Sequence, residues 1–174
     1  ALNIFGDHSD VMACRQTGFA MLCEGNVQEV MDLSPVAHLA ALSGKVPFIN
    51  FFDGFRTSHE IQKIAVWDYK DLADMCDMDA VKAFREHALN PEHPAMRGSH
   101  ENGDTFFQHR EACNQYYDAL PEVVEKYMGK INEKLGTDYK LFNYYGAPDA
   151  DRVIIAMGSI CDVAEEVIDY LNAH

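Results

Sequence analysis

Basic residues are scarce in this sequence of 174 residues. Lys and Arg number 14 against 28 Asp and Glu, which gives a formal net charge of −14 at pH 7. Such a surplus of negative charge repels phosphate backbones and anionic lipid surfaces, so we expect no nucleic-acid partner. No apolar run approaches the length that crosses a bilayer, and we expect no membrane association. The acidity either helps to meet a basic protein or keeps a cytoplasmic protein soluble, and we favour the second interpretation.

Closely spaced cysteines are also missing. The five cysteines contain no C-x-x-C pair and stand at Cys14, Cys23, Cys76, Cys113 and Cys161. An odd number at wide spacing argues for reduced thiols, against a disulfide framework and against an iron–sulfur cluster held by this chain alone. The motifs G-x-x-x-x-G-K-S/T, G-x-G-x-x-G and G-x-S-x-G are absent. The N-terminal "ALNIFGDHSD" lacks a basic targeting region and an initiator Met, and we interpret it as a cut end.

The pattern between residues 17 and 53 predicts a strand, a helix and a second strand. "TGFAMLC" has the length of a buried strand, and "KVPFINFFD" is rich in β-branched and aromatic residues. Between them Asn26 is a good helix N-cap with Glu29 in capping-box position, and Gly44 ends the helical pattern. This order predicts a right-handed βαβ crossover, and hence an α/β fold with a parallel sheet and flanking helices. Ligands of such sheets gather beyond the carboxyl ends of the strands, where "DGFRTSHE" follows the second strand.

The rest of the chain predicts further helices, a long excursion and one more strand. Helical patterns run through "KDLADMC" and "DAVKAFREHAL", and another helix is expected from near Pro121 to Gly136. Residues 90–110 lack a clear period, so we expect an irregular excursion that packs over a surface. "DRVIIAMG" predicts a strand, and Ser159 caps the last helix. Because no further strand follows, half of a βαβ unit is left, and we expect the chain to be truncated at both ends.

Two polar loops contain the first candidates for chemistry. "GDHSD" places Asp7, His8 and Asp10 together, and a carboxylate beside an imidazole can orient a general base. The alternative, which the spacing favours, is a turn whose Asp caps the following helix. In "DGFRTSHE", Arg56 either serves a ligand site or pairs with Asp53, and the sequence leaves both interpretations open.

Two weaker candidates are a metal site and an anion site. His109 and Cys113 would share a helix face, but a metal site needs a third and a fourth ligand, and we do not expect one. "AMGSICD" offers backbone N–H groups at a helix start, which is a general seat for an anion. From these residues alone, a stand-alone acidic α/β module that binds a small anion or a protein partner is one functional interpretation.

A second interpretation comes from five blocks of sequence. They are "IFGDHSDVMACRQTGFAML", "FFDGFRTSHEIQKI", "ALNPEHP", "REACNQYYDALP" and "YYGAPDADRVIIAMGS". In this order the chain resembles an internal segment of pyruvate:ferredoxin (flavodoxin) oxidoreductase, from Ala1 to His174. The resemblance implies that residues 1–138 are the C-terminal part of a thiamine-diphosphate pyrimidine-binding-type domain. It implies that residues 139–174 begin a second, transketolase C-terminal-like α/β domain.

The resemblance also implies an oxidoreductase activity of the complete enzyme. The family oxidatively decarboxylates pyruvate to acetyl-CoA and CO2 with thiamine diphosphate and Mg2+, and passes electrons through [4Fe-4S] clusters to ferredoxin or flavodoxin. Its thiamine-contacting Glu and substrate-binding Arg would precede Ala1, and its diphosphate–magnesium and cluster-binding domains would follow His174. We therefore expect the isolated chain to bind none of these cofactors and to be inactive. Its expected partner is the rest of a cytoplasmic, homo-oligomeric enzyme, through which pyruvate, coenzyme A and ferredoxin or flavodoxin are reached.

Four residues are the expected lining of the cofactor or coenzyme A cavity. They are Asp7, His8, Asp53 and Arg56, which the predicted fold places near the carboxyl ends of the strands. We expect them to support or line the cavity without acting on the substrate. No catalytic and no metal-binding residue is expected within this chain.

Overall fold

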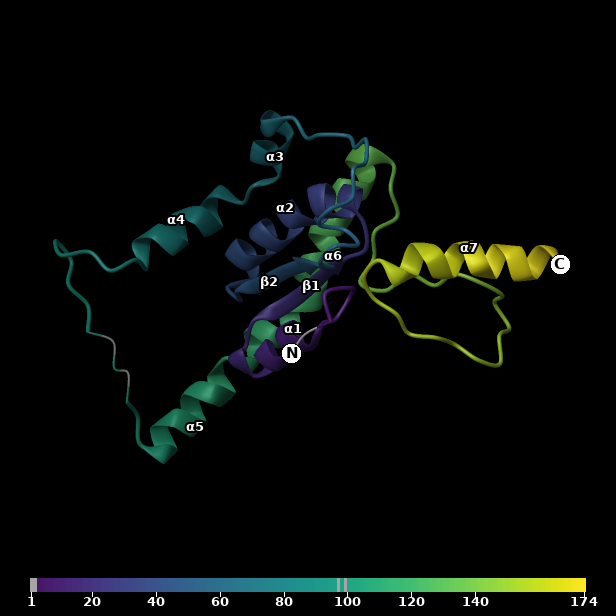
Figure 1. Ribbon diagram of the computed structural model, residues 1–174. Helices are drawn as coiled ribbons and strands as arrows, with labels where there is room; N and C mark the ends of the chain where they lie inside the picture. Colours follow the sequence, from purple (N-terminus) through teal and green to yellow (C-terminus); the bar gives the residue numbers. More distant parts are fainter. Residues whose placement is uncertain (1–2, 97, 99) are drawn as a thin grey trace.

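The computed structural model describes residues 3–96, 98 and 100–174 of the chain. In chain order the elements are α1 (Ser9–Ala13), the 3-10 helix η1 (Cys14–Thr17), β1 (Ala20–Glu24), α2 (Val27–Gly44), β2 (Phe48–Phe52), α3 (Tyr69–Met75), α4 (Met78–Glu86), α5 (Gly103–Ala112), α6 (Asn114–Leu135) and α7 (Ile160–Ala173). Figure 1 shows a central body of β1, β2, α2 and α6, an arm that carries α3, α4 and α5, and α7 projecting from the opposite side.

The body is built on the predicted parallel strand pair. β1 and β2 run in parallel, with Ala20 opposite Phe48 and Glu24 opposite Phe52, and α2 is the crossover between them. The predicted α/β fold with a parallel sheet and flanking helices is therefore confirmed. The carboxyl ends of both strands meet at one edge, which fixes where the loops that follow them lie.

Local hydrogen bonds explain where α2 begins. The Asn26 side chain accepts a hydrogen bond from the Glu29 backbone N–H, as the sequence predicts for an N-cap. The Glu29 carboxylate, however, accepts from the Gly25 N–H at 2.6 Å, one residue before the partner that a capping box would give it. The helix start is thereby tied to the end of β1.

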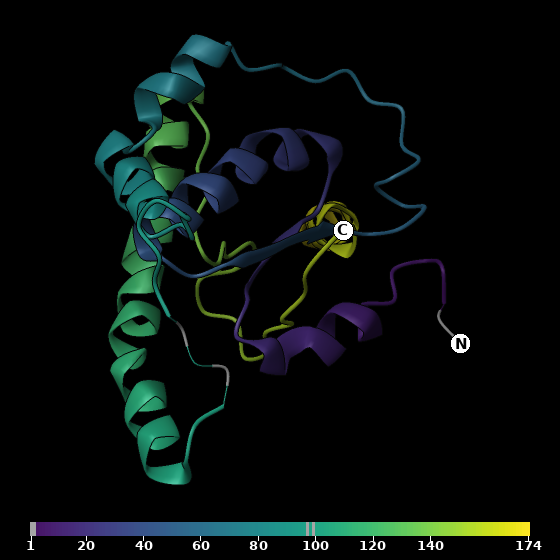
Figure 2. The ribbon, with the colours of Figure 1, turned by 90° about the vertical axis from the view of Figure 1, so that its left-hand side faces the viewer.

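The hydrophobic core lies between α2 and α6. Figure 2 shows α6 running along one side of the body, and the two helices are in direct contact. The buried cluster consists of Leu33, Val36, Leu39, Ala40, Val46, Leu120, Val124, Tyr127, Met128 and Ile131. Half-buried residues of the strands, among them Leu22 and Phe48, pack against this cluster from the sheet. One face of the sheet is thus anchored to both helices.

The predicted start of α6 near Pro121 is wrong. The helix begins at Asn114 and includes Pro121 in its interior. Proline usually interrupts a helix because it lacks an N–H group. Here tertiary contacts hold the helical turns that precede Pro121. Leu120 is buried in the core, and the Tyr117 hydroxyl donates a hydrogen bond to the Gly18 carbonyl at 2.8 Å.

The predicted excursion at residues 90–110 is only partly irregular. Its last part is α5, which begins at Gly103, whereas Arg97 and Ser99 lie outside the described residues. Within α5, His109 Nδ1 lies 2.5 Å from a Glu101 carboxylate oxygen, so His109 pairs with this acid and not with Cys113. The arm exposes several large apolar side chains, among them Phe84, Phe106 and Phe107. The sequence did not predict α5 because the apolar residues of this segment lack a helical period.

The predicted strand at residues 151–158 is also wrong. The segment has no regular secondary structure, no ladder partner reaches it from the described parts of the chain, and Ile154 is 89% exposed. A strand exists only when a neighbour accepts its hydrogen bonds, which no local pattern can supply. The helix after it is confirmed as α7, although the Ser159 side chain makes no cap hydrogen bond.

No helix in the described ranges is both long and apolar enough to cross a bilayer.

Candidate functional site at the carboxyl ends of the strands

Asp53 is the centre of the polar groups at the carboxyl edge of the sheet. It follows β2 directly, and only 4% of its surface is exposed. Its Oδ2 accepts a hydrogen bond from the Ser159 backbone N–H at 2.7 Å, and its Oδ1 lies 2.7 Å from His8 Nε2. One carboxylate therefore joins the N-terminal loop, the end of β2 and the start of α7.

The contact between His8 and Asp53 is an ion pair in distance but not a well-aligned hydrogen bond. The atoms are within ion-pair range, yet Asp53 Oδ1 has no hydrogen-bond partner of acceptable geometry among the described residues. The His8 ring is held on its other side by an edge-to-face contact with Phe51, with centroids 5.5 Å apart. The imidazole is thus held between the Asp53 carboxylate and the Phe51 ring.

Two glycines allow the segments to approach each other. Gly158 has φ +81°, and a Cβ there would lie 2.8 and 2.9 Å from the two carboxylate oxygens of Asp53. A Cβ at Gly25 would lie 3.1 Å from the Gly158 carbonyl oxygen. Since real Cβ contacts of 2.8 Å are essentially not observed, this close approach of residue 158 to the Asp53 carboxylate, which we call the Gly158 seam, requires glycine.

Further hydrogen bonds join the loop after β2 to Gly25, and the start of α2 to α7. The Thr57 hydroxyl donates to the Gly25 carbonyl at 3.2 Å, and Thr57 is buried. The Asn26 side-chain amide donates to an Asp162 carboxylate oxygen at 3.3 Å. We name the contacts of His8, Gly25, Asp53, Gly158 and Ser159 the Asp53 clasp, because together they fasten the segment before α7 to the sheet edge.

Asp7 does not reach the Asp53 clasp. Its carboxylate accepts hydrogen bonds from the Ser9 N–H at 2.8 Å and the Asn3 N–H at 3.1 Å. These bonds, that of Ser9 first, hold the pKa of Asp7 below its ordinary value. Of the two interpretations of "GDHSD", the structure therefore gives Asp7 the turn-stabilising role and gives His8 the contact with a carboxylate, that of Asp53.

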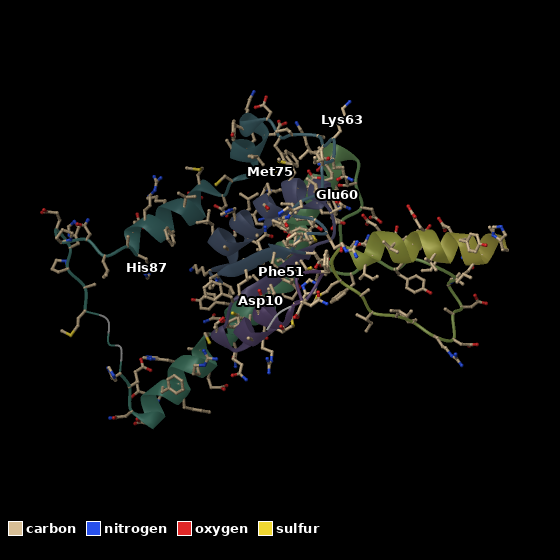
Figure 3. All side chains as sticks on the ribbon, viewed as in Figure 1. Asp10, Phe51, Glu60, Lys63, Met75 and His87 are labelled. Atoms are coloured by element: carbon tan, nitrogen blue, oxygen red, sulfur yellow. The ribbon has the colours of Figure 1, made fainter. Side chains whose placement is uncertain are left out.

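Arg56 does not pair with Asp53 either. Its guanidinium lies over the Phe5 ring, 5.4 Å from the centroid, on the exposed side of the loop. Phe55 beside it adopts the left-handed conformation, with φ 57°, and stacks on His59 with centroids 4.5 Å apart. Figure 3 shows the chain leaving this loop past Glu60 and Lys63 toward α3, while His87 stands far out on the arm.

The thiols near the Asp53 clasp are poor nucleophiles. Burial raises the pKa of Cys23 to about 12, and the neighbouring acids Asp53 and Glu24 add to the effect. Burial also raises the pKa of Cys161 at the start of α7. Since the thiolate is the reactive form, neither cysteine is activated for chemistry.

The arrangement also lacks the donor set of a metal site. Within the described ranges, no group of three or more His, Cys, Asp and Glu side chains could hold a metal ion. The start of α7, where the sequence predicts a seat for an anion, is already filled by the Asp53 carboxylate. A hollow of about 500 Å³ lies elsewhere, between α4 and the following loop, and is lined by residues that include Met78, Arg85 and His93.

Sequence reasoning identified Asp53 and His8 but missed their partners. The sequence predicted that Gly158 and Ser159 start a helix and offer a general seat for an anion, but it did not identify Asp53 as their partner, and Gly25 was not singled out. The signal was present in part, because "MGS" and "EGN" both place glycine next to a helix N-terminus. What could not be known is that these two helix starts face each other.

The fold and this cluster define the chain as an α/β domain of the parallel βαβ class, with its polar loops at the carboxyl ends of the strands. Comparison with known sequences then gives the family. Residues 1–129 match the family described as "Pyruvate flavodoxin/ferredoxin oxidoreductase, thiamine diP-bdg". The chain belongs to this pyruvate flavodoxin/ferredoxin oxidoreductase family, as its five sequence blocks indicated.

Individual relatives agree along almost the whole chain. A pyruvate-flavodoxin oxidoreductase of Enterobacter agglomerans is 64% identical over 173 residues, which is 99% of this chain and 15% of that protein. A pyruvate:ferredoxin oxidoreductase of Moorella thermoacetica is 60% identical over 171 residues, again 15% of its length. A pyruvate dehydrogenase [NADP(+)] of Cryptosporidium parvum is 50% identical over 171 residues, 9% of that protein. The chain thus spans about 15% of the length of the first two of these relatives.

At the carboxyl edge of the sheet, the residues that the structure describes do not by themselves fit thiamine diphosphate, which the family description names. A diphosphate needs a cluster of donors or cations. The backbone donor at the start of α7 is already used by Asp53, and Arg56 lies over Phe5. No step of a reaction is therefore assigned to these side chains.

Proposed function

We propose that this chain is an internal segment of a pyruvate:ferredoxin (flavodoxin) oxidoreductase and acts within that enzyme. The observation that carries the proposal is the 64% identity over 173 residues with a pyruvate-flavodoxin oxidoreductase. The complete enzyme would convert pyruvate to acetyl-CoA and CO2, with thiamine diphosphate, Mg2+ and [4Fe-4S] clusters held by other segments. Its electrons would pass to ferredoxin or flavodoxin, in a cytoplasmic homo-oligomer.

Within that enzyme the proposed role of the chain is structural support of a cavity. His8 and Asp53 would hold the N-terminal loop and the loop after β2 in place, and Arg56 would present a charge on the exposed side. Asp7 would support the cavity only through its own turn. The domain boundary near residue 138 stays a prediction, in which the Asp53 clasp joins the first domain to the segment that opens the second.

We expect the isolated chain neither to turn over pyruvate nor to bind thiamine diphosphate tightly. Catalysis on this cofactor requires both of its ends to be fixed against the substrate, and the seat at α7 is filled by Asp53. Calorimetric titration of the purified chain with thiamine diphosphate and Mg2+ measures the binding. Saturable binding at low micromolar concentration, or pyruvate-dependent reduction of a viologen dye, would contradict the proposed division of labour.

In the complete enzyme we expect Asp53→Asn to lower kcat/KM for pyruvate by about 10- to 100-fold. The amide keeps an acceptor for the Ser159 N–H but loses the charge that faces His8, so the N-terminal loop shifts, and small displacements at a catalytic cavity have effects of this order. The assay is pyruvate-dependent viologen reduction. Asp7→Asn is the matched control, because Asp7 contacts only its own turn, and equal activities of the two variants would remove Asp53 from the proposed support.

A further inference from the structure

The side chain of Glu24, at the end of β1, carries a buried carboxyl group that lacks a hydrogen-bond partner among the described residues. It is 0% exposed, and among the described residues neither of its carboxyl oxygens has a hydrogen-bond partner. The ion pairs within the described ranges do not include it. A buried, unpaired carboxylate is strongly unfavourable, so a group in this position usually becomes neutral instead.

The Asn50 side chain can serve as a hydrogen-bond partner of Glu24. In the parallel register Glu24 lies opposite Phe52 and Leu22 opposite Asn50, so the side chains of Glu24 and Asn50 project from the same face of the sheet, toward α2. The Asn50 amide is the side-chain hydrogen-bonding group beside Glu24. Its Nδ2 already donates to Ser34 Oγ at 2.9 Å, and its Oδ1 has no donor.

Among the described residues the carboxyl oxygens of Glu24 and the Asn50 Oδ1 atom are all acceptors without a partner, so a hydrogen bond between Glu24 and Asn50 Oδ1 requires one added proton. The Ser34 hydroxyl donates its only hydrogen to the Val30 carbonyl at 2.6 Å, and therefore cannot serve the Asn50 oxygen. If the Asn50 amide were reversed, Ser34 would need a second hydrogen to keep both of its bonds. A proton on Glu24 completes the chain, because Glu24 then donates to Asn50, Asn50 donates to Ser34, and Ser34 donates to Val30.

We propose that Glu24 is a neutral carboxylic acid in the folded protein and donates its proton to Asn50 Oδ1, so that its ionisation is a pH-sensitive release for the Asp53 clasp. The next residue, Gly25, accepts from Thr57 and faces the Gly158 carbonyl. Loss of the Glu24 proton therefore loosens the strand end that the clasp is built on. A pH-dependent opening of the Asp53 clasp is part of neither the family description nor the proposed cavity-lining role.

The electrostatic surroundings favour the neutral form. Burial is the first cause that raises the pKa of Glu24, to about 8, and the charge of Glu29 on α2 raises it further, while the nearby hydrogen-bonding groups, the Glu24 backbone N–H and the Asn50 side chain, oppose this rise without cancelling it. Cys23 on the same strand brings no positive charge, and the groups that act on Cys23, namely Asp53, Glu24, Cys161 and Glu29, bring none either. An opened strand end has the ordinary carboxyl pKa of about 4.5, so opening becomes more favourable as the pH rises between about 4.5 and 8, and then levels off.

Hydrogen exchange at different pH values tests the proposal in the complete polypeptide that the gene encodes. Mass spectrometry follows peptides that cover residues 20–25 and 48–53, with rates corrected for the intrinsic pH dependence of exchange. We expect the opening constant to rise about tenfold per pH unit between pH 5.5 and 7.5, hence about 100-fold, and to level off above pH 8. In Glu24→Gln, whose amide can donate to Asn50 but cannot ionise, we expect most of this rise to be lost, leaving only the smaller contribution of Glu29, whose pKa is also raised by burial.

Glu29→Gln is the matched control. Glu29 is also a half-buried acid on the adjacent helix, but its carboxylate accepts from the Gly25 N–H. This variant is expected to keep the rise and to level off at a lower pH, since it removes a neighbouring negative charge. An identical pH dependence in wild type and Glu24→Gln would overturn the proposal. So would a Glu24→Gln protein that fails to fold at pH 6, because that result would mean that the charge of Glu24 is required.

Discussion

Ile131→Ala is expected to lower the free energy of unfolding of the chain by about 2–5 kcal/mol. Ile131 is 0% exposed and belongs to the α6 side of the core against α2. Removing its outer methyl groups costs their transfer from water and leaves a cavity that the two packed helices close only in part. Urea unfolding can be followed by the fluorescence of Trp67, the single tryptophan, which packs against this core.

The matched control is Ile154→Ala. It makes the same chemical change in a side chain that is 89% exposed, so the free energy of unfolding should stay within about 0.5 kcal/mol of wild type. A similar loss in both variants would show that the buried cluster between α2 and α6 is not the core. It would also mean that residues 151–158 are packed in solution.

Gly158→Ala is expected to open the Asp53 clasp. The substitution carries two costs, about 1–2 kcal/mol for a Cβ in the left-handed region and about 1–3 kcal/mol for overpacking against the Asp53 carboxylate. Both follow from φ +81° and from the distances of 2.8 and 2.9 Å between the added Cβ and the carboxylate oxygens. The most direct relief is movement of the segment before α7. Hydrogen exchange of residues 158–165 should therefore accelerate, while α2 and α6 keep their protection.

Gly136→Ala separates the two costs. Gly136 follows α6 with φ +73°, but nothing lies within 4 Å of an added Cβ, so this variant carries the backbone cost alone. It should destabilise the chain by about 1–2 kcal/mol and leave exchange near α7 unchanged. Equal protection of residues 158–165 in both variants would show that the Gly158 seam does not hold α7.

Much of the βαβ unit could be predicted from the sequence, because its signals are local. The strand patterns, the Asn26 cap and the final helix each depend on neighbouring residues, and all three are present in the structure. Once the two strands are parallel, the position of Asp53 at their carboxyl edge follows from geometry. The family likewise follows from long blocks of sequence, and the profile match confirms it.

The tertiary structure decided the features that depend on a distant partner. Residues 151–158 have the composition of a strand but lack a ladder in the described chain, and Pro121 lies within a helix because Leu120 is anchored in the core. The Asp53 clasp joins residues 106 positions apart, since the Ser159 N–H donates to Asp53. A local pattern specifies the conformation of its own segment, whereas the partner of a buried carboxylate is set by which segments the packing of α2, α6 and the sheet brings together.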